Sequence, residues 1–164
     1  MTQPIKKALC GAVVTIGLGV ITARAEHFDI TMTVEGAGKK AEAYADDSPP
    51  PEGLHPRPVL QAHAGVPLTL QFFMTYVNPH DVDKQVTIRF YVTPETRLGQ
   101  KGVPLPDGKP AIEGTFVMDL KPKSRLGLTQ KFRIARPGVY LLRLESVNSH
   151  SDHQHFSAID LVIE

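Results

Sequence analysis

An alternation of apolar and polar side chains in residues 68–77, LTLQFFMTYV, decides the fold class of this 164-residue chain. The apolar face of this stretch consists of Leu68, Leu70, Phe72, Met74 and Tyr76. Because successive side chains of a strand point to opposite faces, this period of two predicts a β-strand with one face in a core. Residues 28–34 and 86–92 carry the same pattern. Asn78 followed by Pro79 predicts a turn after residue 77.

Turn signals divide the rest of the chain into further strands. We expect these at residues 59–63, 111–120, 126–134, 139–146 and 155–163. Prolines and glycines predict two long connections, at residues 39–58 and 94–110, since proline cannot donate to a strand ladder. No amphipathic helix of three turns and no internal repeat is evident. Seven or eight strands separated by turns predict an all-β protein, an antiparallel β-sandwich.

Residues 135–144, ARPGVYLLRL, resemble the corner that leads into the sixth strand of immunoglobulin-like domains. The resemblance implies a tight turn at Gly138 and a hydroxyl of Tyr140 that bonds back to the corner backbone. The inter-sheet cysteines and core tryptophan of antibody domains are absent, so it implies the immunoglobulin-like architecture and not an antibody-type receptor. The whole chain is also similar to uncharacterised exported bacterial proteins with such a sandwich. That similarity implies no activity.

The first 25 residues have the layout of a secretory signal peptide. Two lysines precede an uncharged run at residues 8–21, and Ala23 and Ala25 are the small residues expected before a cleavage site. The run is shorter than the roughly 20 residues that a membrane-spanning helix needs, so we expect no stable membrane span after cleavage. A retained anchor is the alternative. Residues 26–164 are expected to form a single immunoglobulin-like domain that is periplasmic or secreted.

Cleavage would also change the chemistry of the chain. It would remove Cys10, the only cysteine, so the mature domain would have no disulfide. It would remove three of the 18 basic residues and none of the 17 acidic ones, which leaves a net charge of about −2. The remaining lysines and arginines are interspersed with acidic residues, whereas a nucleic-acid-binding surface needs a clustered basic patch. We therefore expect no nucleic acid as a partner.

A histidine-rich loop at residues 148–155 is the strongest chemical signal. Neutral imidazole is the commonest metal ligand and suits copper and zinc. In an immunoglobulin-like strand order, this loop shares one pole of the sandwich with the turn after residue 77 and with the start of the first strand. The predicted metal ligands are therefore His150, His153, His155, His27 and His80. A solvated polar loop that binds no ion is the alternative.

The sequence offers no catalytic residue. It has no Gly-x-Ser-x-Gly elbow and no phosphate-binding glycine loop, and no cysteine remains after cleavage. We expect a non-enzymatic binding or interaction module of the cell envelope, with another envelope protein as its partner. The alternative is a periplasmic copper- or zinc-binding protein that uses the histidines, and the second alternative is a metal-dependent enzyme.

Two aromatic side chains, Phe73 and Tyr91, point away from the core faces of their predicted strands. Such aromatics either form a surface for a partner or lie beneath a loop. The two long connections favour the second arrangement for both residues.

Overall fold

The structure is a computed structural model, and it describes residues 28–45, 56–76, 79–100, 109–147 and 154–164. These residues form nine strands and no helix. Accordingly, none of the described segments is a helix of the length and hydropathy that a bilayer crossing requires.

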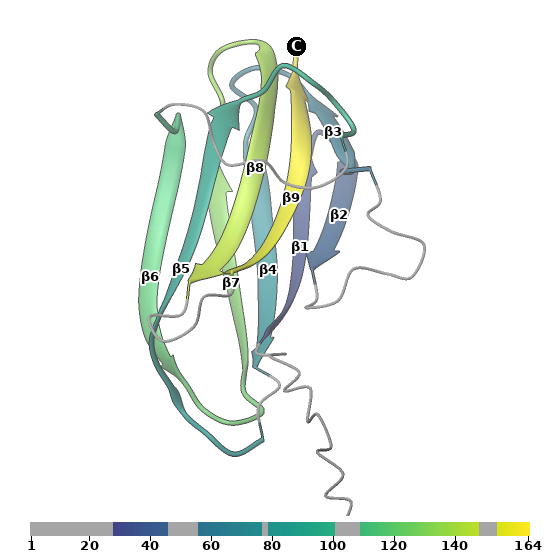
Figure 1. The fold of residues 1–164 in the computed structure, drawn as a ribbon. Helices are drawn as coiled ribbons and strands as arrows, with labels where there is room; N and C mark the ends of the chain where they lie inside the picture. The colour runs from purple at the N-terminus through teal and green to yellow at the C-terminus, as the bar shows by residue number, and fades with distance from the viewer. Residues whose placement is uncertain (1–27, 46–55, 77–78, 101–108, 148–153) are drawn as a thin grey trace, which may run out of the picture.

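The nine strands of the described residues are divided between two sheets that pack face to face (Figure 1). The first has the order β2-β1-β4-β7, with bounds Lys39–Ala45, Phe28–Gly36, Leu68–Tyr76 and Arg125–Phe132. The second has the order β3-β9-β8-β5-β6, with bounds Val59–Ala62, Gln154–Ile163, Gly138–Val147, Asp83–Pro94 and Ile112–Leu120. All neighbouring strands are antiparallel except β3 and β9, which are parallel. The predicted all-β sandwich is confirmed, and the division of its strands follows the immunoglobulin-like pattern.

The core between the sheets is built from the alternating side chains that the sequence predicted. On β4 all five apolar positions of the 68–77 stretch are buried. β5 and β8 supply the facing row from the other sheet: Val86, Ile88, Phe90, Val92, Tyr140, Leu142 and Leu144. Interlocking rows of this kind are what a period of two produces when two sheets stack.

One strand, β2, lies where the sequence predicted a long connection. Ala37 and Gly38 both have positive φ (52° and 76°), and they form the two-residue turn that returns the chain from β1. On β2, Ala41 and Ala43 face the core. The prediction was wrong here because alanine is a weak strand former and the prolines that follow dominate the local pattern. The described residues therefore hold nine strands instead of seven or eight.

The corner before β8 has the geometry that the resemblance implied. The Tyr140 hydroxyl donates a hydrogen bond to the carbonyl oxygen of Arg136 at 3.0 Å. Gly138 has a φ of 152°, which disfavours a side chain at that position. The tyrosine therefore ties the start of β8 to the turn that brings the chain over from β7.

Candidate functional site

The predicted metal ligands adjoin the ends of four strands. Phe28 at the start of β1 pairs with Tyr76 at the end of β4, and Val147 at the end of β8 pairs with Gln154 at the start of β9. In Figure 1 these ends point toward the same half of the sandwich, but the end of β8 and the start of β9 stop well short of the start of β1 and the end of β4. The described strand ends therefore do not meet at one level, and the shared histidine pole is still a prediction.

The histidines themselves are only partly described. His80 is an exposed residue of the β4–β5 connection, and His155 belongs to β9, where it pairs with Ser146. The side chain of His155 and all of His27, His150 and His153 lie outside the described residues. Among the residues that the structure does describe, no three His, Cys, Asp or Glu side chains are grouped as a metal site.

The strand register sets the level of His80 relative to His155. Ser146, the pairing partner of His155, also pairs with Ile88 on β5. β5 begins five residues earlier, at Asp83. At about 3.3 Å per residue, the connection that carries His80 joins β5 roughly 15 Å beyond the level of His155.

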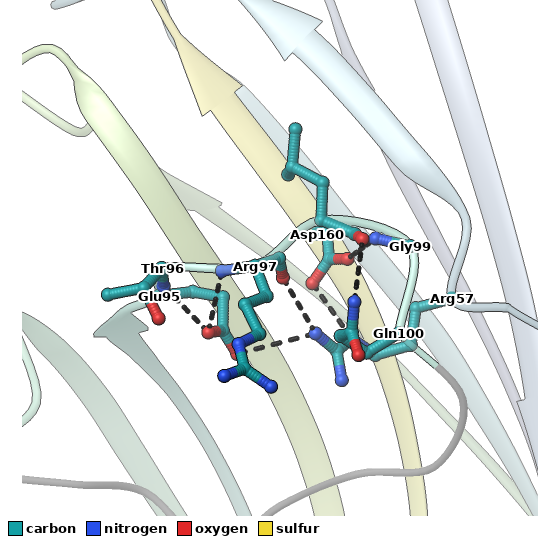
Figure 2. A network of polar contacts seen from close by, with 8 residues as sticks. Arg57, Glu95, Thr96, Arg97, Gly99, Gln100 and Asp160 are labelled. Atoms are coloured by element: carbon teal, nitrogen blue, oxygen red, sulfur yellow. Dashed lines mark hydrogen bonds and ion pairs between the residues drawn. The ribbon is translucent and has the colours of Figure 1, made fainter.

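A buried ion pair fixes the segment 95–100 to the outer face of the five-stranded sheet (Figure 2). Arg57 Nε donates to Asp160 Oδ1 at 2.8 Å, and the backbone NH of Gly99 donates to Asp160 Oδ2 at 2.7 Å. The side chain of Asp160 is fully buried. Its two oxygens therefore both accept charge-assisted or backbone hydrogen bonds, which offset the cost of burying a carboxylate.

Arg57 also reaches the other end of that segment. Its Nη2 donates to Glu95 Oε2 at 3.3 Å and to the carbonyl oxygen of Arg97 at 3.2 Å. Its backbone NH donates to the carbonyl oxygen of Gln100 at 3.0 Å. One arginine thus holds the segment at three points and connects it to β9.

A second buried polar cluster lies on the outer face of β5 and β8. Glu145 Oε2 accepts hydrogen bonds from the Tyr91 hydroxyl at 3.1 Å and from Arg143 Nε at 3.0 Å. Arg89 binds the other carboxylate oxygen through Nε, at 2.8 Å, and Nη2. Burial is the main cause that raises the pKa of Tyr91 from 10.0 to about 12; Glu145 adds to this rise, and the nearby Arg143 opposes it. A phenol with so high a pKa is not suited to exchange protons at neutral pH.

Both clusters are structural in their geometry. The carboxylates of Asp160 and Glu145 are occupied by donors on each oxygen, so neither is placed to take a proton from a substrate. The sequence did not single out these residues, because a charged residue at an outward strand position is normally solvated. The only sequence signal was charge within a strand that is otherwise strongly apolar, as in LLRLES at residues 141–146.

Among the described residues, aromatic side chains on the outer face of the four-stranded sheet are more exposed than Tyr91 on the outer face of the five-stranded sheet. Tyr44, Thr31 and Phe73 lie in one row across β2, β1 and β4. The side chains of Tyr44 and Phe73 are 67% and 42% exposed, whereas Tyr91 on the other sheet is 2% exposed. The expectation that a loop covers Phe73 is therefore wrong. Tyr91 is buried as expected, and the contacts described for it come from Arg89 on β5 and Glu145 on β8.

The ring of Phe73 lies beside Arg125 and over Gly127. The guanidinium carbon of Arg125 lies 4.3 Å from the ring centroid, within the range of a cation–π contact. The ring also covers Gly127, where an added Cβ would meet it at 2.7 Å. Neighbouring strands are about 4.8 Å apart, so the two exposed aromatics stand roughly 10 Å from each other across the sheet. The result is a flat, exposed surface with two aromatic side chains, which we call the aromatic face (Tyr44, Thr31, Phe73 and Arg125).

Comparison with known proteins gives no indication of function, so the proposal below depends on the geometry of the described residues. No protein-family model matches the chain, and the search of curated proteins finds no significant match.

Proposed function

We propose that this chain is an exported, non-enzymatic binding module that engages another envelope protein through its aromatic face. The difference between the two outer sheet surfaces supports the proposal. The outer surface of the five-stranded sheet holds buried ion pairs and a docked segment, while the four-stranded sheet leaves Tyr44 and Phe73 exposed.

The chemistry of the aromatic face fits a protein partner. Exposed tyrosine and arginine are enriched at the centres of protein interfaces, and rigid aromatic rings lose little conformational entropy on binding. Charged side chains of both signs, Lys40 and Glu42, lie on the same face of β2 as Tyr44, four and two residues before it. Polar and charged residues beside an apolar centre are usual in such an interface.

The test is photo-crosslinking in the cell envelope. A photoreactive residue at position 44 is expected to capture one partner, while the same photoreactive residue at position 59 is not. Val59 is a matched control because it is 42% exposed and lies on β3 of the other sheet. With the captured protein purified, the double variant Tyr44→Ser/Phe73→Ser is expected to weaken binding at least tenfold, since truncation of a hot-spot aromatic costs about 2 kcal/mol. Equal capture from both positions, or an unchanged Kd, contradicts the proposal.

Export is tested separately, by N-terminal sequencing of the protein recovered from the envelope fraction. A mature chain that starts at Glu26 is the expected result. A chain that keeps residues 1–25 and remains in the cytoplasm contradicts export.

The histidine pole supports a second candidate, a copper- or zinc-binding protein. The observation in its favour is that the ends of β1, β4, β8 and β9 that adjoin the predicted ligands point toward the same half of the sandwich. Calorimetric titration of the processed chain with Cu(II) and Zn(II) tests it. Micromolar binding that is lost in His153→Ala/His155→Ala is expected. Binding weaker than about a millimolar, roughly −4 kcal/mol, contradicts a metal function.

A further inference from the structure

One side of the sandwich is open. The two sheets approach each other most closely along β1, β2, β3 and β9, where Lys39 Nζ on β2 donates to Gln61 Oε1 on β3 at 3.2 Å. The opposite side is formed by the edge strands β6 and β7. Figure 1 shows β6 as the outermost strand on that side. We call the edges of β6 and β7 the open side.

Core-facing side chains on the open side are incompletely covered. One sheet has five strands and the other has four, so β6 lacks a strand opposite it among the described residues. Its apolar row and that of β7 are only half-buried: Ile112, Phe116, Met118, Leu126 and Leu128. The vacant strand position beside β7 would cover this row if another strand filled it.

The two edges lack two of the features that normally prevent strand addition, proline and inward-pointing charges. Natural edge strands are also protected by outward-pointing charges and by bulges; the one irregularity in the strand pairing of the described residues is a register shift between Asp83 and Val86 of β5, where β5 pairs with β6. β6 and β7 have eight or nine residues each, contain no proline, and carry no charge on their core-facing positions. Their charges are on the outer face, and they have opposite signs: Glu113 and Asp119 on β6, Arg125 and Lys131 on β7.

We infer that two copies of this chain associate through their open sides, with β6 of each copy adding to β7 of the other as an antiparallel neighbour. One register matches every charge on the outer face. Its outer-face pairs are Glu113 with Lys131, Thr115 with Thr129, Val117 with Gly127, and Asp119 with Arg125. The same register places Phe116 opposite Leu128 and Met118 opposite Leu126 on the core face. Opposite charges and apolar pairs at directly facing positions both stabilise a strand pair.

A two-fold axis parallel to the strands produces both pairings at once. Such a rotation places the five-stranded sheet of one copy in the same layer as the four-stranded sheet of the other. In each of the two layers, β6 of one copy therefore meets β7 of the other. It also preserves the level of each residue along the strands. β6 ends at Leu120 and β7 begins at Arg125, so the ends of the two strands lie at similar levels. The register that pairs opposite charges therefore also aligns the strand ends, as the two-fold axis requires.

This arrangement removes the open side. Each β6 occupies the vacant position beside β7 of the other copy, and the two β6 strands then face each other across the interior. The closed two-fold contact is the commonest symmetry of soluble oligomers. Alternative pairings are disfavoured, since β6 with β6 places Glu113 near Asp119 and β7 with β7 places Arg125 near Lys131.

The inference does not depend on the proposed envelope partner, because its readout is the oligomeric state of the purified chain. Sedimentation velocity of the processed chain is expected to show a dimer. Two charge-reversal variants are each expected to raise the dimer Kd at least about tenfold: Glu113→Lys/Asp119→Lys on β6, and Arg125→Glu/Lys131→Glu on β7. A matched control, Lys40→Glu/Glu42→Lys on β2, is expected to leave the Kd unchanged.

Mixing the two charge-reversal variants gives the decisive result. In the mixed dimer every facing pair is again of opposite sign, so the mixture is expected to recover the dimer that neither variant forms alone. A register test accompanies it: Thr115→Cys/Thr129→Cys is expected to form disulfide-linked dimers on oxidation, and Thr115→Cys/Thr33→Cys is not. A monomeric wild-type chain at tens of micromolar, or a mixture that stays monomeric, overturns the inference.

Discussion

Replacing Arg57 by methionine tests whether one buried ion pair holds the segment 95–100 against the sheet. The Arg57 and Asp160 side chains are 3% and 0% exposed, and 2.8 Å separates Nε from Oδ1. Methionine keeps most of the apolar stem, so the change removes the charge and its hydrogen bonds with little loss of volume. It leaves the Asp160 carboxylate buried without its counter-ion, which typically costs 3–5 kcal/mol. Against a typical total stability of about 5–15 kcal/mol, this loss is large.

The assay is urea unfolding of the purified protein at neutral pH, and the free energy of unfolding in water is obtained by linear extrapolation. Asp160→Asn keeps an acceptor for the Gly99 NH but removes the negative charge. The double variant Arg57→Met/Asp160→Asn is expected to cost less than the two single changes together, by about 1–3 kcal/mol, because the residues are in contact.

A matched control is Lys40→Met, which breaks the exposed pair between Lys40 and Glu42. That pair has a separation of 3.4 Å and side chains that are more than half exposed. Its loss is expected to change stability by no more than about 0.5 kcal/mol. The reasoning is refuted if Arg57→Met costs less than about 1 kcal/mol, or if the effects of the two buried changes simply add.

Two further predictions concern a buried phenol and two glycines. Because the pKa of Tyr91 is raised from 10.0 to about 12 in the fold, its contribution to stability is constant below pH 10 and is lost as the pH rises towards 12. Ultraviolet titration of tyrosinate is expected to show a component that ionises near pH 12, and Tyr91→Phe is expected to remove it; a wild-type titration without that component contradicts this. Gly114→Ala places a Cβ 2.3 Å from the buried Phe90 ring and is expected to cost about 1–3 kcal/mol, while Gly127→Ala meets the exposed Phe73 ring, which can turn aside, and is expected to cost less. Equal losses in thermal unfolding would contradict the difference in burial.

The main features of the fold could be predicted because they depend on local patterns. The period of two in residues 68–77 determines which face of β4 is buried, whatever its neighbours are. The corner around Tyr140 depends on a tight turn and one hydroxyl, and both are visible in the sequence. β2 could not be found in the same way, because Ala41 and Ala43 are too small to mark a core face and are buried only by the strands around them.

The burial of the charged residues could not be predicted from the sequence, for a different reason. Asp160 and Glu145 occupy outward positions of their strands, where the alternation predicts solvent. Their burial depends on which segments cover that sheet face, and this is a property of the tertiary structure. The metal site is still a prediction. His27, His150 and His153 lie outside the described residues, and the connection that carries His80 meets β5 well beyond the level of His155.

The position of β9 has a consequence for the biogenesis of the chain. It is the last of the nine described strands, yet it lies between β3 and β8, and among the described strands β3 pairs with β9 alone. A nascent polypeptide therefore cannot complete this sheet, or bring Arg57 to its carboxylate, until residues 154–163 have left the ribosome. Contacts between such distant parts of a sequence form slowly. A topology of this kind leaves the second sheet unfinished until almost the whole chain has been synthesised.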